Sequence, residues 1–370
     1  MVDRFLDWAV ATRLLQSNPL AELRSQYLQR TTTPIVRALL NPDSTVALEA
    51  LRPLPRFGSF LGPAMRDHVA LMKSVGYRYT AEERGLLRFD RFLQQHPGLR
   101  GQSLKRMVRE WTNATPTAEH AWRCSQIGRT LSKALRRLDP TIELIPVDGD
   151  LGKRARQLHR RPHIYREDEV CRLLEMARNF PSPRAPLRPV ALYTMLVLAY
   201  CAGLRLGEIV HLNVGDVHLD DGTIEIRDTK FFKSRRLPLS SSVLSALQSY
   251  LDARQQAGAP NEPAAGLFWQ QRTDERYSYV AAGQLLRRVL ERAGLKPREK
   301  PQPRIHDLRH AFVVNRMLTW YREGVNPQPL LPYLATYLGH KDVNSTLVYL
   351  TITQELLQQA GERFRAFGAV

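Results

Sequence analysis

The sequence predicts a mainly helical protein with a small antiparallel β-sheet, an α+β fold in more than one domain. Three observations support this prediction. Apolar residues recur at helical spacing between capping residues over most of the chain. The apolar run of residues 190–204 is too short to span a membrane and predicts a buried helix. After Asp216 the pattern changes to the alternation that is typical of strands.

Residues 1–54 are predicted to be an N-terminal accessory segment, with a helical pattern at its start and a proline-broken stretch at its end. Residues 55–150 predict a compact domain of short helices. Thr80 and Glu83 have the spacing of a capping box, Ser103 is placed to cap a second helix, and Thr117 to open a third.

Positive charge is concentrated in the middle of the chain. The formal net charge is +18, and residues 55–163 alone hold 21 basic and 10 acidic residues. This excess predicts a polyanionic partner, most simply nucleic acid. Residues 151–163 hold no acidic residue and are predicted to be a basic linker along the phosphate backbone, in preference to a solvated charge run. The linker cations are Lys153, Arg154, Arg156, Arg160 and Arg161.

Residues 164–370 are expected to form a second domain. A helix is predicted to begin at Glu167, and the buried helix follows a proline-rich loop. Two strands are predicted at residues 223–226 and 236–239, joined by a hairpin crowded with cations. Its four cations are Lys230, Lys233, Arg235 and Arg236, of which the last three are candidate DNA contacts.

Two arginines have the surroundings of phosphate clamps. The planar guanidinium of arginine can grip two oxygens at once and does not lose its proton. Glu208 follows Arg205 by three residues and His306 precedes Arg309 by three, so each pair shares a helix face. Glu208 is predicted to be a supporting residue that orients Arg205.

A tyrosine and two histidines complete a set that can cut a phosphodiester. Tyr349 is the candidate nucleophile, and its phenol needs cationic neighbours or a base to attack at neutral pH. His306 and His340 can both donate to phosphate oxygens, and either can accept the tyrosine proton.

The motifs AGLRLGE, HDLRH and LGHKDVNSTLVY occur in that order at residues 202–208, 306–310 and 338–349. Together they resemble the tyrosine recombinases (the phage integrase family), and the resemblance covers roughly the last two thirds of the chain. It implies a core-binding domain at residues 55–150 and a catalytic domain at 164–370 with a C-terminal assembly helix. The implied catalytic set is Arg205, Lys230, His306, Arg309, His340 and Tyr349.

The resemblance also implies individual roles. Lys230 would donate the proton to the leaving 5′-oxygen, with Lys233 as the rival for this role. His306 would handle protons and His340 would bind phosphate. No metal-ligand spacing and no phosphate-binding loop motif occurs, so neither metal nor cofactor is expected.

The implied activity is site-specific recombination through a 3′-phosphotyrosine and a Holliday junction. The expected partners are double-stranded DNA with specific recombination sites and further copies of this chain, two on a site and four in the synapse. Accessory DNA-bending proteins or a partner recombinase are further candidate partners. The alternatives are a type IB topoisomerase-like relaxing enzyme and a catalytically inactive DNA-binding subunit. No export signal or membrane partner is expected, and the expected location is the cytoplasm, at the nucleoid.

Overall fold

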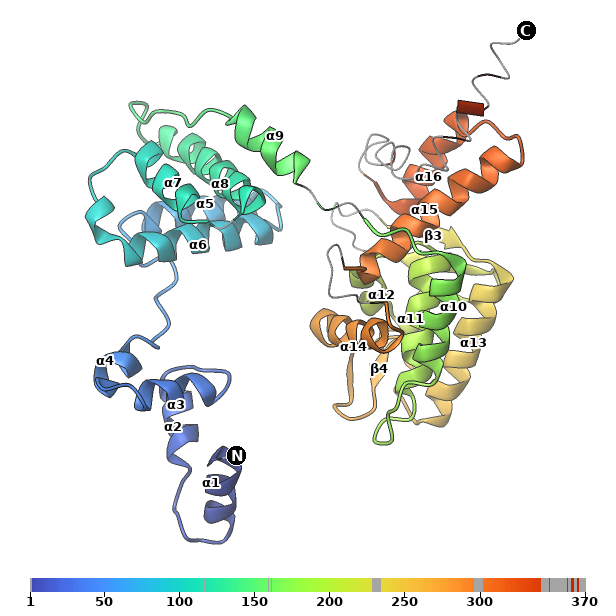
Figure 1. Ribbon diagram of the computed structural model, residues 1–370, viewed down its shortest axis with the longest axis horizontal. Coiled ribbons are helices and arrows are strands. Elements are labelled where there is room, and N and C mark those ends of the chain that lie inside the picture. Colours follow the sequence, from blue (N-terminus) through green and yellow to red (C-terminus); the bar gives the residue numbers. More distant parts are fainter. Residues whose placement is uncertain are drawn as a thin grey trace. The chain divides into compact units, whose positions relative to one another are not determined.

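The computed structural model describes residues 2–115, 117–158, 160, 162–227, 234–295 and 302–340, together with residues 346, 358, 361, 362 and 365. The chain divides into two compact units, Met1–His159 and Arg160–Val370. Both are built mainly from helices (Figure 1). The division falls inside the segment that the sequence predicts to be a linker.

The first unit begins with a small helical subdomain that the sequence only partly predicts. Its short core is formed by Leu20, Tyr27 and Ile35. The helices are α1 (Val2–Ala11), α2 (Pro19–Gln26), α3 (Thr33–Leu39) and α4 (Ser44–Glu49).

A second core in this unit, around Phe89 and Trp111, holds the predicted helical domain together. Ser103 and Thr117 cap helices as predicted, each accepting a backbone N–H three residues ahead at 3.3 Å. The capping box at Thr80 is wrong, because the Glu83 carboxylate pairs with Lys73 at 2.6 Å instead. The helices are α5 (Gly62–Ser74), α6 (Thr80–Gln95), α7 (Leu104–Asn113) and α8 (Ala118–Arg136).

Most of the predicted linker is a helix that belongs to the first unit. Helix α9 (Gly149–Gln157) is capped by Asp148, which accepts the N–H of Leu151 at 2.8 Å. Its small residues face α8, and a Cβ on Gly152 would lie 3.0 Å from the ring of Trp122. Residues 151–157 of the predicted linker are therefore helical, because a seam of small residues lets this segment pack against α8, and their contact with a phosphate backbone stays a prediction.

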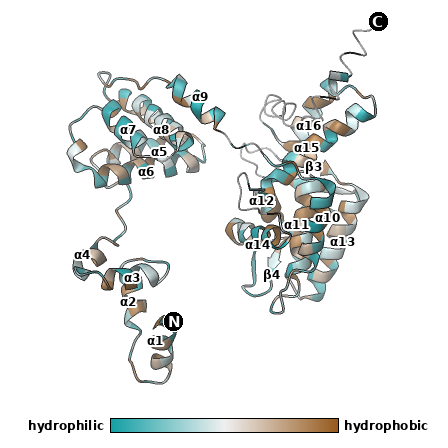
Figure 2. Cartoon of the chain, viewed as in Figure 1, coloured by the Kyte–Doolittle hydropathy of each residue, from teal (hydrophilic) through white to brown (hydrophobic). Residues whose placement is uncertain are grey.

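The second unit surrounds one apolar helix. Helix α11 contacts α10, α13 and α15, and hydrophobic colouring runs along most of it in Figure 2. No helix in the described ranges is long and apolar enough to cross a bilayer. The helices of this unit are α10 (Glu167–Arg178), α11 (Arg188–Cys201), α12 (Leu206–His211), α13 (Ser241–Gln256), α14 (Tyr279–Arg292), α15 (Ile305–Arg322) and α16 (Leu331–Leu338). Two 3₁₀ turns also belong to it, η2 (Val214–Asp216) and η3 (Gln328–Leu330). A further 3₁₀ turn, η1 (Pro97–Leu99), lies in the first unit.

The predicted sheet is present and has three antiparallel strands in the order β1-β2-β3. Strand β1 is Val217–His218, β2 is Thr223–Ile226 and β3 is Arg235–Pro238. Strand β3 begins one residue earlier than predicted, and Arg235 is paired with Ile226. The sequence did not predict the second, two-stranded sheet of β4 (Trp269–Gln270) and β5 (Glu275–Arg276).

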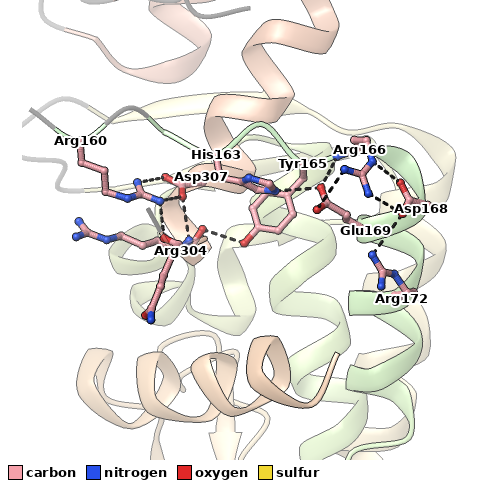
Figure 3. A network of polar contacts seen from close by, with 10 residues as sticks. Arg160, His163, Tyr165, Arg166, Asp168, Glu169, Arg172, Arg304 and Asp307 are labelled. Atoms are coloured by element: carbon pink, nitrogen blue, oxygen red, sulfur yellow. Dashed lines mark hydrogen bonds and ion pairs between the residues drawn. The ribbon is translucent and has the colours of Figure 1, made fainter. Parts of the chain in front are cut away.

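An ion pair anchors the start of the second unit on the first turn of α15 (Figure 3). The Arg160 guanidinium donates to both carboxylate oxygens of Asp307 at 3.0 and 2.5 Å, and to the carbonyl of Gln302 at 2.6 Å. The same carboxylate caps α15 by accepting the backbone N–H of Arg304 at 2.9 Å. Because Asp307 is only 2% exposed, this arginine balances a buried charge. Arg160 therefore has a structural partner, and the phosphate contact predicted for it stays a prediction.

We expect Arg160→Ala to lower the free energy of unfolding by about 3 kcal/mol, because it leaves a buried carboxylate without its cation. Urea unfolding of the full chain near neutral pH measures this loss. The matched control is Arg172→Ala, which removes an exposed arginine paired with the exposed Asp168 in the same region. The control should lose markedly less stability. Equal losses in the two variants would contradict a structural role for the Arg160–Asp307 pair.

Candidate active site

The site begins where α11 ends and α12 starts. Gly203 has a φ of +61°, a left-handed conformation that favours glycine and lets the chain turn between the two helices. Arg205 then occupies the N-cap of α12. Glu208 accepts both the backbone N–H and the Nη1 of Arg205, each at 2.9 Å. The AGLRLGE motif thus brings the Glu208 carboxylate against both the backbone and the side chain of Arg205.

Helix α15 brings the second clamp arginine to the same carboxylate. The Arg309 side chain is buried and donates to the carbonyls of Gly203 and Leu338, each at 2.6 Å. Its Nη1 lies 3.8 Å from Glu208 Oε2. Arg309 therefore joins the end of α11, the start of α12 and the end of α16.

His340 follows the end of α16. That helix ends at Gly339, whose φ of +66° turns the chain and directs the next residue away from the helix axis. The half-buried His340 shares a hydrogen bond of 2.7 Å between its Nδ1 and the Oγ1 of the buried Thr346. Thr346 thereby fixes the orientation of the imidazole ring.

His306 lies one helical turn before Arg309. Partial burial of the ring, with the charges of Arg309 and Arg205, holds the pKa of His306 below its ordinary value. The neutral imidazole is therefore favoured near neutral pH, and a neutral imidazole can accept a proton. His310 packs edge-on against it at 5.1 Å between ring centroids, and burial lowers the pKa of His310 to about 4.

The electrostatics of the site are dominated by arginine. Burial raises the pKa of Glu208, but the charge of Arg235, the Arg205 backbone N–H and the charges of Arg309 and Arg205 outweigh it and hold that pKa below its ordinary value. An ionised Glu208 among three guanidinium groups leaves an excess of two positive charges. Such an excess beside donors in fixed positions suits a phosphate-bearing ligand.

The sequence did not predict that Arg235 lies in the site beside Glu208. It was predicted to contact DNA, yet its side chain is only 10% exposed and its Nη2 lies 3.1 Å from Glu208 Oε2. A signal was present, because Arg235 and Leu237 share one face of β3 and Leu237 is buried. Arg236, on the other face, is exposed and pairs with Asp221.

The remaining predicted residues fall into two groups. On α9, three cations have exposed side chains and stay available for a polyanion, namely Lys153, Arg154 and Arg156. Four further predicted residues lie outside the residues that the structure describes, namely Arg161, Lys230, Lys233 and Tyr349. Across the described ranges, no group of three or more His, Cys, Asp or Glu side chains is arranged to hold a metal ion.

Comparison with known proteins identifies the family. The model of the phage integrase family matches residues 164–355. The chain is 32% identical over 314 residues to the Sinorhizobium fredii protein named "Putative integrase/recombinase y4rB", a match that covers 81% of this chain and 95% of that protein. It is 30% identical over 221 residues to "Tyrosine recombinase XerD" of Oceanobacillus iheyensis, covering 60% of this chain and 65% of that protein.

Solved structures share the fold. A structure of the Tn1549 transposon integrase in complex with transposon right end DNA gives a TM-score of 0.61 at 16% identity, over 82% of this chain and 99% of that chain. A lambda integrase tetramer bound to a Holliday junction gives 0.53 at 18% identity, over 84% and 86%. With the family match over more than half of the sequence, the chain belongs to the phage integrase family and is a tyrosine-type site-specific recombinase.

Proposed function

We propose that this recombinase cuts and rejoins DNA strands through a 3′-phosphotyrosine on Tyr349 and a Holliday junction. The observation that carries the proposal is the meeting of Arg205 and Arg309 on Glu208, within a turn of His306. Two fixed guanidinium groups beside a neutral imidazole are what a phosphodiester needs to be held while a phenol attacks it.

The proposed cleavage step balances in bonds and protons. The Tyr349 oxygen forms a bond to phosphorus while the bond from phosphorus to the 5′-oxygen breaks. The two clamp arginines neutralise the charge that develops on the non-bridging oxygens. His306 accepts the phenol proton and His340 donates to a phosphate oxygen. Lys230 protonates the leaving 5′-oxygen, with Lys233 as the alternative acid.

The phosphotyrosine conserves the energy of the broken bond, so rejoining is the same step in reverse with a 5′-hydroxyl as the attacking group. Attack by a hydroxyl from the partner duplex exchanges the strands. In this scheme every bond that forms or breaks joins atoms of the DNA, of Tyr349 or of the side chains that transfer protons.

The proposed partner is double-stranded DNA that carries specific sites, bound by two copies of the chain, with four copies in the synapse. The exposed cations Lys153, Arg154 and Arg156 of α9 support contact with the backbone. The shared fold with a lambda integrase tetramer bound to a Holliday junction supports the assembly. We also propose that an accessory DNA-bending protein or a partner recombinase takes part, and that the protein acts in the cytoplasm at the nucleoid.

Tyr349→Phe should abolish strand cleavage and leave DNA affinity nearly unchanged, because only the attacking oxygen is lost. A denaturing gel for covalent protein–DNA adducts measures cleavage, and a gel shift on a half-site measures affinity. An adduct formed by the variant would show that another residue is the nucleophile.

A supercoiled plasmid with two recombination sites, incubated with the unaltered protein or with Tyr349→Phe, distinguishes a recombinase from the two alternative functions. Exchanged products with the unaltered protein support recombination through Tyr349. Relaxed circles alone indicate a topoisomerase-like enzyme, and binding alone indicates an inactive subunit. Either of these last two results would contradict the proposal.

Lys230→Ala should slow cleavage of ordinary DNA strongly, because the 5′-alkoxide would leave without a proton. The loss should be far smaller on a substrate with sulfur at the leaving position, since a thiolate leaves unprotonated. Single-turnover cleavage of both substrates measures this, with Lys233→Ala as the matched control. If sulfur rescues Lys233→Ala and not Lys230→Ala, the acid is Lys233.

A further inference from the structure

We propose that Arg235 is a positioning residue for strand cleavage, which fixes the clamp carboxylate Glu208 and the last turn of α16 relative to each other. This inference rests on the proposed function and extends it to a residue outside the six-residue catalytic set. It follows from the place of one buried arginine on a strand that is otherwise apolar on its inner face.

The strand puts Arg235 on the core side of the sheet. In the antiparallel register Arg235 lies opposite Ile226, and Leu237 lies opposite Ile224. These three apolar side chains are buried, at 2% exposure or less. A guanidinium on such a face needs an opposite charge nearby, because burying an unpaired charge is costly.

Arg235 makes one hydrogen bond and one ion pair, with two different parts of the site, while its Nη1 and Nη2 have no hydrogen-bond partner among the described residues. Its Nε donates to the carbonyl of Tyr337 at 2.9 Å, and its Nη2 lies 3.1 Å from Glu208 Oε2. Tyr337 is in the last turn of α16, whereas Glu208 is in the first turn of α12. Arg235 therefore bridges the helix that precedes His340 and the carboxylate that orients Arg205.

Gly339 gives the guanidinium its space. A Cβ at this position would lie 2.7 Å from Arg235 Nη1 and 3.0 Å from its Cζ. The arginine therefore packs directly against the backbone of the residue that precedes His340. A shift of Arg235 would open a gap on that side of the turn, where no side chain of residue 339 can fill it.

The three arginines of the site share the end of α16. The last carbonyls of a helix have no partner inside it and carry partial negative charge. The carbonyl of Leu338 accepts from Arg309 at 2.6 Å and from Arg205 at 3.4 Å, and the carbonyl of Tyr337 accepts from Arg235. Arg235 thus completes a cluster in which Glu208 and one helix end hold all three guanidinium groups.

The test compares Arg235→Ala with Arg227→Ala. Arg227 follows β2 in the same sheet and also pairs with a buried carboxylate, Asp216 at 2.8 Å, but it contacts neither Glu208 nor α16 in the described contacts. Single-turnover adduct formation at saturating protein measures the cleavage rate, and a gel shift on a half-site measures affinity.

Arg235→Ala should lower the cleavage rate by about 100-fold, the order expected when reacting groups are misplaced by about 1 Å. Half-site affinity should change less than about twofold, because the Arg235 side chain is only 10% exposed and is proposed to hold protein groups rather than to touch DNA. Arg227→Ala should keep the cleavage rate within about twofold of the unaltered protein. Equal cleavage rates for the two variants would overturn the inference, as would parallel losses of cleavage and affinity in Arg235→Ala.

Arg235→Lys keeps the test decisive if the alanine variant does not fold. A lysine keeps the charge but cannot span both acceptors with a planar fork. It should cleave at a rate between those of the alanine variant and the unaltered protein, about tenfold slower than the latter. A lysine variant that cleaves at the unaltered rate would overturn the inference.

A double-mutant cycle with Glu208→Gln shows whether Arg235 acts through Glu208. Removing both partners should cost much less than the sum of the two single losses on the logarithmic scale. Additive losses would overturn the coupling. If the unaltered protein forms no adduct at all, the proposed function fails and this inference fails with it. Adduct formation at equal rates with and without Arg235 refutes this inference alone.

Discussion

The second unit depends on one buried carboxylate. Glu208 caps α12 through the backbone of Arg205, orients the side chain of the same residue, and attracts Arg235 and Arg309 from two other elements. A carboxylate with one cation would be an ordinary ion pair. With three arginines around it, Glu208 holds α12, β3 and α15 together. The three guanidinium groups carry two more charges than the carboxylate, and this excess is available to a ligand.

The C-terminal end of α16 holds the same three arginines that surround Glu208. Its terminal carbonyls accept from all three arginines, and Gly339 then turns the chain into His340. The groups that would hold a phosphate are therefore the same groups that hold the fold together. Asp307, two residues before Arg309 in the first turn of α15, adds support, because Arg160 and the backbone of Arg304 bind its carboxylate. The chemistry thus rests on side chains that have few alternative conformations.

The sequence predicts this molecule best where the cause is local. Ser103 and Thr117 cap their helices because a cap needs only the next three residues. Arg205 and Glu208 are neighbours in sequence and also contact each other, whereas Arg309 is found through its motif although its contacts are with residues far away in sequence. In contrast, the predicted cap at Thr80 fails because Lys73, from the preceding helix, draws Glu83 away.

The remaining errors have the same long-range origin. A run of cations at residues 151–161 predicts a basic linker, yet Gly152 packs against Trp122 and most of this segment is the helix α9. Strand alternation separates the adjacent arginines at positions 235 and 236 and puts the first on the face of the buried Leu237. Only the folded structure shows that this face meets Glu208, while Arg236 is exposed and pairs with Asp221. Register between strands is set by tertiary contacts, which single-sequence patterns do not contain.

The state of Glu208 is the most direct test of this account. Burial alone would raise the pKa of the carboxyl group, whereas the surrounding arginines and the backbone N–H of Arg205 lower it. The ¹³C resonance of the Glu208 carboxyl, assigned with Glu208→Gln and followed in the full chain as the pH is lowered, measures which effect prevails. The account predicts that the group stays ionised down to the ordinary glutamate pKa of about 4.3. A titration midpoint above that value would contradict the arginine-centred site.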